Sequence, residues 1–304
     1  MSSVLYDSQG PRAKRRNIVI SVLFLAALAG VLWWMYTMLD EKGQLQWVLW
    51  EPFFTGTEAW NTYLWPGLQN TLKAAALAMV IALPLGAVLG IARLSEHAWV
   101  RVPAGVVVEF FRAIPVLVLM IFGLALFSEY TSVNTDDRPL YAVVTGLVLY
   151  NSSVLAEIVR AGILSLPRGQ AEAALAVGLR KNQVMRFILL PQAVTAMLPA
   201  IVSQLVVIVK DTALGGAVLT FPELLASASS MIGYYGNPIA SFTVVAVIFI
   251  VLNFALTSFA SWLEGRLRRG KRSTGAVLGA DAVDELSAPG DHVDVTHDGG
   301  KKGP

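Results

Sequence analysis

The sequence predicts an all-α polytopic membrane protein with six membrane-spanning helices. Hydrophobic residues make up 55% of the 304 positions and charged residues only 14%, about half the charged share of an ordinary soluble protein. The apolar residues gather in runs of about 20 or more, the length that a helix needs to cross a bilayer. Lys and Arg are concentrated in alternate loops between these runs, as in a chain that crosses a membrane repeatedly.

The predicted spans follow one another along the chain. They cover residues 17–39, 70–93, 104–127, 140–163, 188–209 and 239–263. The first resembles the start of a signal peptide, but it is longer than a signal's apolar region and ends in Trp33 and Trp34, which are typical of a membrane boundary. It is therefore predicted to be a retained helix. Glu109 and Arg112 interrupt the third span, and Pro115 is expected to kink it.

The distribution of positive charge predicts the orientation of the chain. Four Lys and Arg precede the first span, five lie in the 160–187 loop and five directly follow the last span, whereas the 40–69 and 210–238 loops hold one each. Because cytoplasmic loops carry the excess of Lys and Arg, both termini and the 160–187 loop are expected in the cytoplasm.

Composition excludes several classes of chemistry. Cysteine is absent, so the chain forms no disulfide, thiolate metal site or cysteine nucleophile. Its histidines are His97, His292 and His297, all outside the apolar runs, so we predict no metal site. The glycine spacing that ends at Lys271 resembles a phosphate-binding loop, but Arg272 occupies the required Ser/Thr position. We expect no catalytic residue and no cofactor bound by this chain.

The stretch GQAEAALAVGLRKN, residues 169–182, is too short and too charged to span a membrane. As a helix it has one small, shallow apolar face. The residues on that face are Ala171, Ala174, Leu175, Gly178 and Leu179. Periodicity alone fits a helix that docks on another protein and a helix that lies on lipid headgroups equally well.

The spacing over residues 172–191 separates these alternatives. It reproduces the pattern EAA-x3-G-x9-I-x-L-P through Glu172, Ala173, Ala174, Gly178, Ile188, Leu190 and Pro191. This pattern resembles the cytoplasmic signature of the membrane subunits of bacterial ABC importers, in which the EAA helix fits a groove on the ATPase subunit. The resemblance implies a set of ATPase-coupling residues. They are Gln170, Glu172, Ala173, Ala174, Gly178, Leu179 and Arg180.

Further stretches, among them EFFRAIPVLVL and LTFPELL, resemble the polar amino acid permeases of these importers, the binding-protein-dependent inner-membrane components. The resemblance implies the type I ABC importer transmembrane fold, with a five-helix core plus one extra N-terminal transmembrane helix. The implied segments follow in chain order. They are a cytoplasmic basic tail (1–16), the extra helix (17–39), an external aromatic-rich loop (40–65), the permease domain (66–265) with its coupling loop (about 165–191), and a cytoplasmic basic segment with a disordered tail (266–304).

The implied function is that of a permease subunit in an ATP-driven importer of polar amino acids, and we expect glutamate or glutamine as its substrate. The implied partners are two ATP-binding cassette subunits carrying ATP and Mg, a second permease subunit (identical or paralogous), an external solute-binding protein, the polar amino acid and the lipid bilayer, but no nucleic acid. The implied location is the bacterial inner or plasma membrane. An ion-coupled secondary amino acid transporter is the alternative, and it leaves the EAA helix without a role.

Polar groups within the spans or at a span's edge are candidates for the substrate pathway. They are Asn151, Ser152, Ser153, Ser203, Gln204 and Lys210. The uncharged groups among them are equally suited to hydrogen bonding between helices. Lys210 lies at the outer end of the fifth span, where gating and snorkelling fit it equally well. Four charged residues form two pairs at helical i, i+3 spacing. They are Glu109 with Arg112 and Glu157 with Arg160, which we interpret as local ion pairs near the cytoplasmic boundary.

Overall fold

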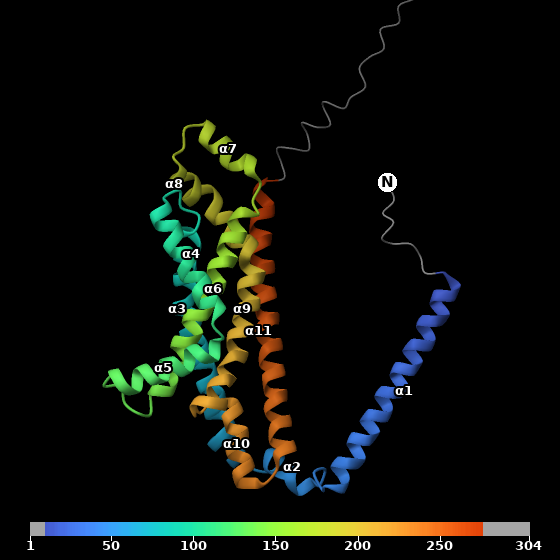
Figure 1. Cartoon of the computed structure of the whole chain (residues 1–304). Coiled ribbons are helices and arrows are strands. Elements are labelled where there is room, and N and C mark those ends of the chain that lie inside the picture. Colours follow the sequence, from blue (N-terminus) through green and yellow to red (C-terminus); the bar gives the residue numbers. More distant parts are fainter. Residues whose placement is uncertain (1–9, 276–304) are drawn as a thin grey trace, which may run out of the picture.

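The computed structural model describes residues 10–275, which form helices joined by short turns (Figure 1). The helices, in chain order, are α1 (Pro11–Glu41), α2 (Trp47–Phe54), the π-helical η2 (Ala59–Leu64), α3 (Trp65–Ala92), α4 (Ala98–Ala113), α5 (Val116–Tyr130), α6 (Arg138–Leu164), α7 (Arg168–Ala176), α8 (Lys181–Gln183), the π-helical η3 (Val184–Leu189), α9 (Leu190–Leu219), α10 (Leu224–Tyr235) and α11 (Pro238–Gly275). The tail that we predict to be disordered lies outside the described residues from 276 onward, while residues 266–275 continue α11.

The bundle is built around α6, which packs against α3, α5, α9 and α4. Helix α11 lies along α9 (Figure 1). Helices α7 and α8 lie at one end of the bundle, and α10 and α2 lie at the other (Figure 1). The bundle therefore carries its short, non-spanning helices at its two ends.

Small residues allow α3 and α6 to approach closely. A Cβ added at Gly86 would lie 2.6 Å from the Cβ of Leu155, and one added at Gly90 would lie 2.6 Å from the carbonyl oxygen of Ala156. Because lipid tails are as apolar as the helices, van der Waals packing of this kind drives helix association in membranes. The glycine pair is thus a helix–helix contact.

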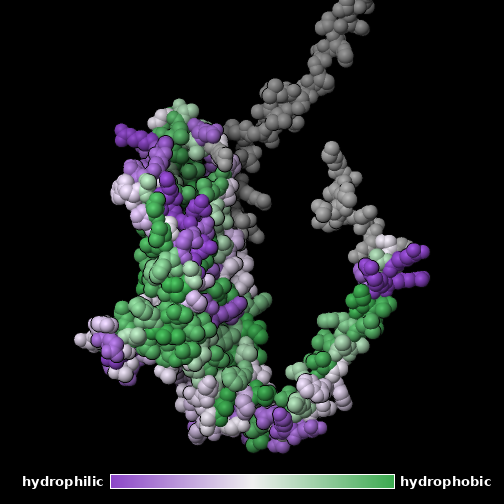
Figure 2. Space-filling view, in the orientation of Figure 1, coloured by the Kyte–Doolittle hydropathy of each residue, from purple (hydrophilic) through white to green (hydrophobic). Residues whose placement is uncertain are grey.

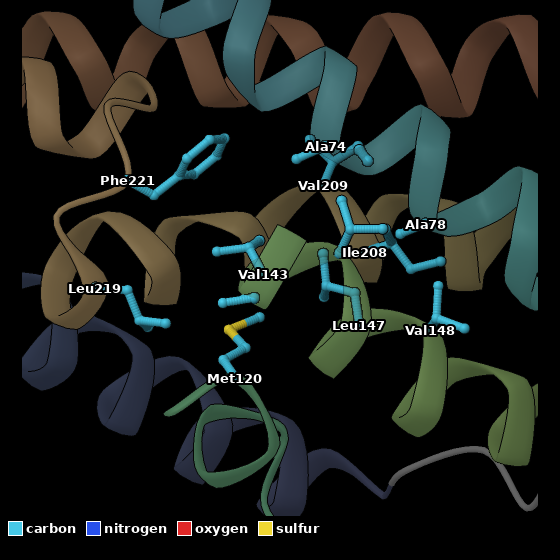
Figure 3. Packing of buried hydrophobic residues seen from close by; sticks show 13 residues of the cluster. Ala74, Ala78, Met120, Val143, Leu147, Val148, Ile208, Val209, Leu219 and Phe221 are labelled. Carbon is cyan, nitrogen blue, oxygen red and sulfur yellow. The ribbon is translucent and has the colours of Figure 1, made fainter. Parts of the chain in front are cut away.

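The largest apolar core joins α3, α5, α6 and α9 (Figure 3). Val143 and Leu147 of α6 are fully buried there, between Met120 of α5 and Ile208 of α9. Phe221, in the turn after α9, covers one end of this core (Figure 3). The core therefore fixes the positions of the helices that carry the candidate site residues.

Among the described residues, five helices are long and apolar enough to cross a membrane, and α4 with α5 forms a sixth candidate that is bent by 98°. The span predicted over 104–127 is thus two helices rather than one kinked helix. Pro115 supplies no backbone N–H and disfavours a helical conformation at the preceding residue, and Ile114 is accordingly extended, with φ −90° and ψ 130°.

Helix α1 stands apart from the bundle (Figure 1), and none of its apolar stretch is buried. Its surface is largely hydrophobic (Figure 2), as a helix that meets lipid requires. The 40–65 segment that follows contains α2 and η2 instead of an irregular loop. Phe53 and Leu64 in this segment pack against Met231 of α10 in a second apolar cluster.

Candidate coupling and translocation sites

The candidate coupling segment is α7 with the turn that follows it. Helix α7 begins after Pro167, whose ψ of 126° lies outside the helical range. Along α7, Glu172 and Ala173 are exposed and Ala174 is buried. Leu175 is 42% exposed and Val177 just beyond the helix is 80% exposed. The segment therefore presents apolar side chains to its surroundings at the end of the bundle.

Gly178 ends this helix, and here the helical face predicted from the sequence needs correction. Helix α7 stops at Ala176, so Gly178 and Leu179 do not continue its face. Gly178 has φ +88°, a left-handed backbone conformation that is unfavourable for residues with a Cβ atom. Its N–H donates to the oxygen of Leu175 at 3.0 Å, and that of Leu179 donates to the oxygen of Ala174 at 3.1 Å. These two bonds form a Schellman motif.

The remaining coupling candidates are Gln170, in the first turn of α7, and Arg180, just beyond the turn at Gly178. Gln170 is half-buried, and its Oε1 has no hydrogen-bond partner among the described residues. Arg180 is exposed, and its backbone N–H donates to Oε1 of Gln183 at 2.8 Å, which stabilises the start of α8. Hydrogen bonds from backbone N–H groups thus stabilise the turn from Gly178 to Arg180, while the side chain of Arg180 is exposed.

The ammonium group of Lys181 holds the coupling segment to the α3–α4 turn by a hydrogen-bonded ion pair with Glu96. The hydrogen bond and the positive charge of Lys181 lower the pKa of Glu96. Both side chains are exposed, at 65% and 66%, so salt screens their attraction. A cavity of about 520 Å³ separates the two segments and includes Ala171, Leu175 and Val100 in its lining. The sequence pattern of the loop contains no indication of Glu96 as a partner.

Five charged residues form a network that connects α3, α4 and α6. Arg93, directly after α3, contacts Oε2 of Glu157 at 2.5 Å and Oε1 of Glu109 at 3.0 Å. Arg112 lies 3.4 Å from Oε2 of Glu157, and Arg160 lies 3.1 Å from its Oε1.

The two pairs expected from spacing are present in this network. Glu157 and Arg160 lie 3.1 Å apart, and Glu109 and Arg112 lie 3.8 Å apart. The sequence did not indicate Arg93, which contacts both glutamates, because its partners are distant in sequence and its position after a span indicated only topology. The network is therefore a tertiary contact between helices as well as two local pairs.

Four pathway candidates are buried inside the subunit. Gln204 of α9 donates from Nε2 to Oδ1 of Asn151 on α6 at 2.5 Å, and Asn151 donates to the oxygen of Leu147 at 2.7 Å. Ser152 and Ser153 donate to carbonyl oxygens one turn earlier on α6. Asn151 and Ser153 are at most 1% exposed. In this conformation these groups bond to helices instead of lining an open pathway.

The other two pathway candidates are exposed. Ser203 donates to the oxygen of Pro199 at 3.0 Å on α9. Lys210 lines a groove of about 690 Å³ between α9, α10 and α11, together with Asn253 and mostly apolar side chains. Oδ1 of Asn253 is buried and has no hydrogen-bond partner among the described residues. The sequence did not indicate a role for Asn253, because it is a single polar residue within an apolar run.

Glu223 organises the opposite end of the bundle. Its carboxylate caps α10, accepting from the N–H of Leu225 at 2.8 Å and from that of Ala226 at 2.7 Å. The side chain is fully buried, and this burial raises the pKa of Glu223. A Cβ added at Gly216 would lie 1.9 Å from Oε1 of Glu223. Glu223 thus stabilises the turn between α9 and α10, a role that the LTFPELL stretch did not indicate.

The bundle of spanning helices, with a short exposed helix between two of them, is that of a multi-pass membrane protein. The chain belongs to the family of binding-protein-dependent transport system inner membrane components, whose model matches residues 82–269. The glutamate transport system permease GluD of Corynebacterium glutamicum is 47% identical over 234 residues, which cover 77% of this chain and 85% of that protein. The glutamate/aspartate import permease GltK of Escherichia coli is 34% identical over 209 residues, 67% of this chain and 93% of that protein.

Solved structures show the same fold. The crystal structure of an amino acid ABC transporter with histidines aligns with a TM-score of 0.61 and 27% identity, covering 67% of this chain and 93% of that chain. The methionine ABC transporter in an inward-facing conformation aligns with a TM-score of 0.55 and 24% identity. The fold is therefore that of type I ABC importer permeases, and the chain is an amino acid transport permease.

Proposed function

We propose that this chain forms half of the translocation pathway of an ATP-driven importer, and that glutamate or glutamine is its substrate. The observation that carries the proposal is the exposed segment of α7, shaped by the left-handed turn at Gly178 and placed at one end of the bundle. The relative with 47% identity is a glutamate transport permease. An ion-coupled secondary transporter would leave this segment without a role.

The partners follow from the proposed coupling. Two ATP-binding cassette subunits dock on the α7 segments of two permease subunits, which are identical or paralogous, and ATP with Mg is hydrolysed on those partners. A solute-binding protein delivers the amino acid at the opposite end, where α10 and α2 lie. This arrangement places α7 and both termini in the cytoplasm, in agreement with the distribution of Lys and Arg.

The exposed groove beside Lys210 is the proposed contribution of this chain to the pathway. A charged side chain on a spanning helix is costly in lipid, so it faces a water-filled cavity or a partner protein. Lys210 is exposed in the single subunit, and we place it toward the second permease. An ammonium group there attracts the carboxylate of a passing amino acid.

Reconstitution into proteoliposomes tests the proposal. The chain is co-expressed with an ATP-binding cassette subunit and a solute-binding protein from the same organism, and uptake of radiolabelled glutamate and glutamine is measured with ATP inside the vesicles. We expect uptake that requires ATP, the ATPase and the binding protein. Uptake by the chain alone, driven by a proton or sodium gradient, would instead establish the secondary transporter.

A further inference from the structure

A groove on the surface of the bundle is lined by arginines from three different segments. It has a volume of about 680 Å³ and runs along one face of α4. The residues of α4 that line it are Arg101, Val102, Gly105, Val106, Glu109 and Phe110. Arg93, after α3, and Arg160, near the end of α6, complete the lining. We call this surface the α4 groove.

The α4 groove carries an excess of positive charge. Three arginines and one glutamate line it. Arg112 and Glu157, which contact the lining residues, add one charge of each sign and leave the excess of two unchanged. Hydrophilic residues gather over α4 and α6 toward the end that carries α7, while the surface further along the bundle is apolar (Figure 2). Such a site attracts an anion at the edge of the apolar belt.

The same groove has an exposed apolar wall. Val102, Val106 and Phe110 are 57%, 63% and 59% exposed, and their spacing places them along one side of α4. Trp99, at the start of this helix, is 76% exposed, and tryptophan is enriched where a membrane helix meets the headgroups. A ligand that fits both features has an anionic group joined to hydrocarbon chains. Free phosphate would leave the apolar wall uncovered.

We propose that the α4 groove binds an anionic phospholipid, with its phosphate against the arginines and its acyl chains along the wall formed by Val102, Val106 and Phe110. The planar guanidinium groups match the geometry of phosphate oxygens. The bound lipid also balances the excess charge left by the ion-pair network. This proposal does not depend on the identity of the transported amino acid.

Two substitutions address the charge and the space of the groove separately. Arg101→Gln removes one positive charge, and the guanidinium group of Arg101 bonds to a backbone oxygen, that of Ser95 at 3.0 Å. Gly105→Leu fills the groove, because a Cβ at Gly105 meets nothing within 4 Å. Arg138→Gln is the matched control, since it removes the same charge at the opposite end of α6.

Native mass spectrometry of the detergent-purified full chain measures binding of phosphatidylglycerol, phosphatidylcholine and inorganic phosphate. We expect phosphatidylglycerol to be retained over phosphatidylcholine. Arg101→Gln should weaken retention of phosphatidylglycerol about fivefold, which is the roughly 1 kcal/mol typical of one basic residue near an anionic surface. Gly105→Leu should abolish the preference, and Arg138→Gln should preserve it.

Three results would overturn the proposal. Equal retention of the two lipids shows that charge does not select the ligand. Wild-type retention in Arg101→Gln places the lipid elsewhere, and this variant also decides the question if Gly105→Leu does not fold. Displacement of phosphatidylglycerol by millimolar phosphate with no lipid preference identifies a free-anion site instead.

Discussion

Gln204 and Asn151 join α9 to α6 through a hydrogen bond of 2.5 Å between two buried side-chain amides. Asn151 also donates to the oxygen of Leu147 within its own helix. Both residues are pathway candidates on sequence grounds, but their burial and mutual bond make them a link between two spanning helices. Interhelical bonds of this kind contribute about 0.6 to 2 kcal/mol in membrane proteins.

Gln204→Leu should therefore lower the thermal unfolding temperature of the purified protein in detergent, because Oδ1 of Asn151 loses its donor while remaining buried. The expected loss is about 1 kcal/mol. Ser203→Ala, an exposed neighbour on the same helix, should have no effect. The double variant Gln204→Leu with Asn151→Leu should have an unfolding temperature closer to that of the wild type than Gln204→Leu alone, because both polar partners are removed. An unchanged unfolding temperature in Gln204→Leu would show that the bond contributes nothing.

Substitutions at Gly178 separate backbone conformation from docking space. A Cβ at this position meets nothing within 4 Å inside the subunit, but φ is +88°. Alanine in the left-handed region costs about 1–2 kcal/mol, whereas asparagine tolerates it. We expect Gly178→Asn to retain more ATP-dependent uptake than Gly178→Ala, although its side chain is larger. The reverse order would mean that the space for the docked ATPase is the limiting factor.

Arg93→Gln removes the most buried arginine of the charge network and leaves Glu109 and Glu157 with only their more exposed arginine partners. Because Arg93 is 13% exposed and contacts both carboxylates, we expect a loss of about 1 kcal/mol in the free energy of unfolding. Adding Glu157→Gln should recover part of that loss. Chemical denaturation in detergent measures both changes, and identical stability of Arg93→Gln and the wild type would rule out a structural role for the network.

Gly216→Ala tests whether the Glu223 carboxylate stabilises the turn between α9 and α10. Its Cβ would overlap Oε1 of Glu223, which lies 1.9 Å away, so the carboxylate must leave the N–H groups of Leu225 and Ala226. Loss of a helix cap costs about 1 kcal/mol, and we expect a lower unfolding temperature. Gly233→Ala, on α10 with nothing within 4 Å of its Cβ, is the control and should match or exceed wild-type stability. Equal unfolding temperatures of the two variants would contradict a stabilising role of Glu223.

The spanning helices could be predicted from the sequence because apolar run length and the distribution of Lys and Arg are local signals. Pro115 likewise indicated a break in the third span. The 98° angle between α4 and α5 could not be predicted, because the rule for proline marks where a helix breaks, while packing against α6 determines where the next helix goes.

The candidate site was only partly predictable for the same reason. The EAA spacing identified the coupling segment, but a helical face that includes Gly178 does not take into account that a glycine after a short helix is a signal for the helix end. Arg93, Glu96 and Asn253 acquire their partners or neighbours through tertiary contacts, which spacing along the chain does not encode.

The central claim, that the α7 segment docks on an ATPase, can be tested by site-specific cross-linking. The chain contains no cysteine, so Val177→Cys introduces a single thiol at a side-chain position that is 80% exposed. A photoreactive thiol label at this position should cross-link to the co-purified ATP-binding cassette subunit, and the yield should change when ATP is added. The same label on Ser229→Cys, on α10 at the opposite end of the bundle, should give no such product. An assembled complex in which Val177→Cys gives no ATPase adduct, or in which Ser229→Cys gives it, would contradict the claim.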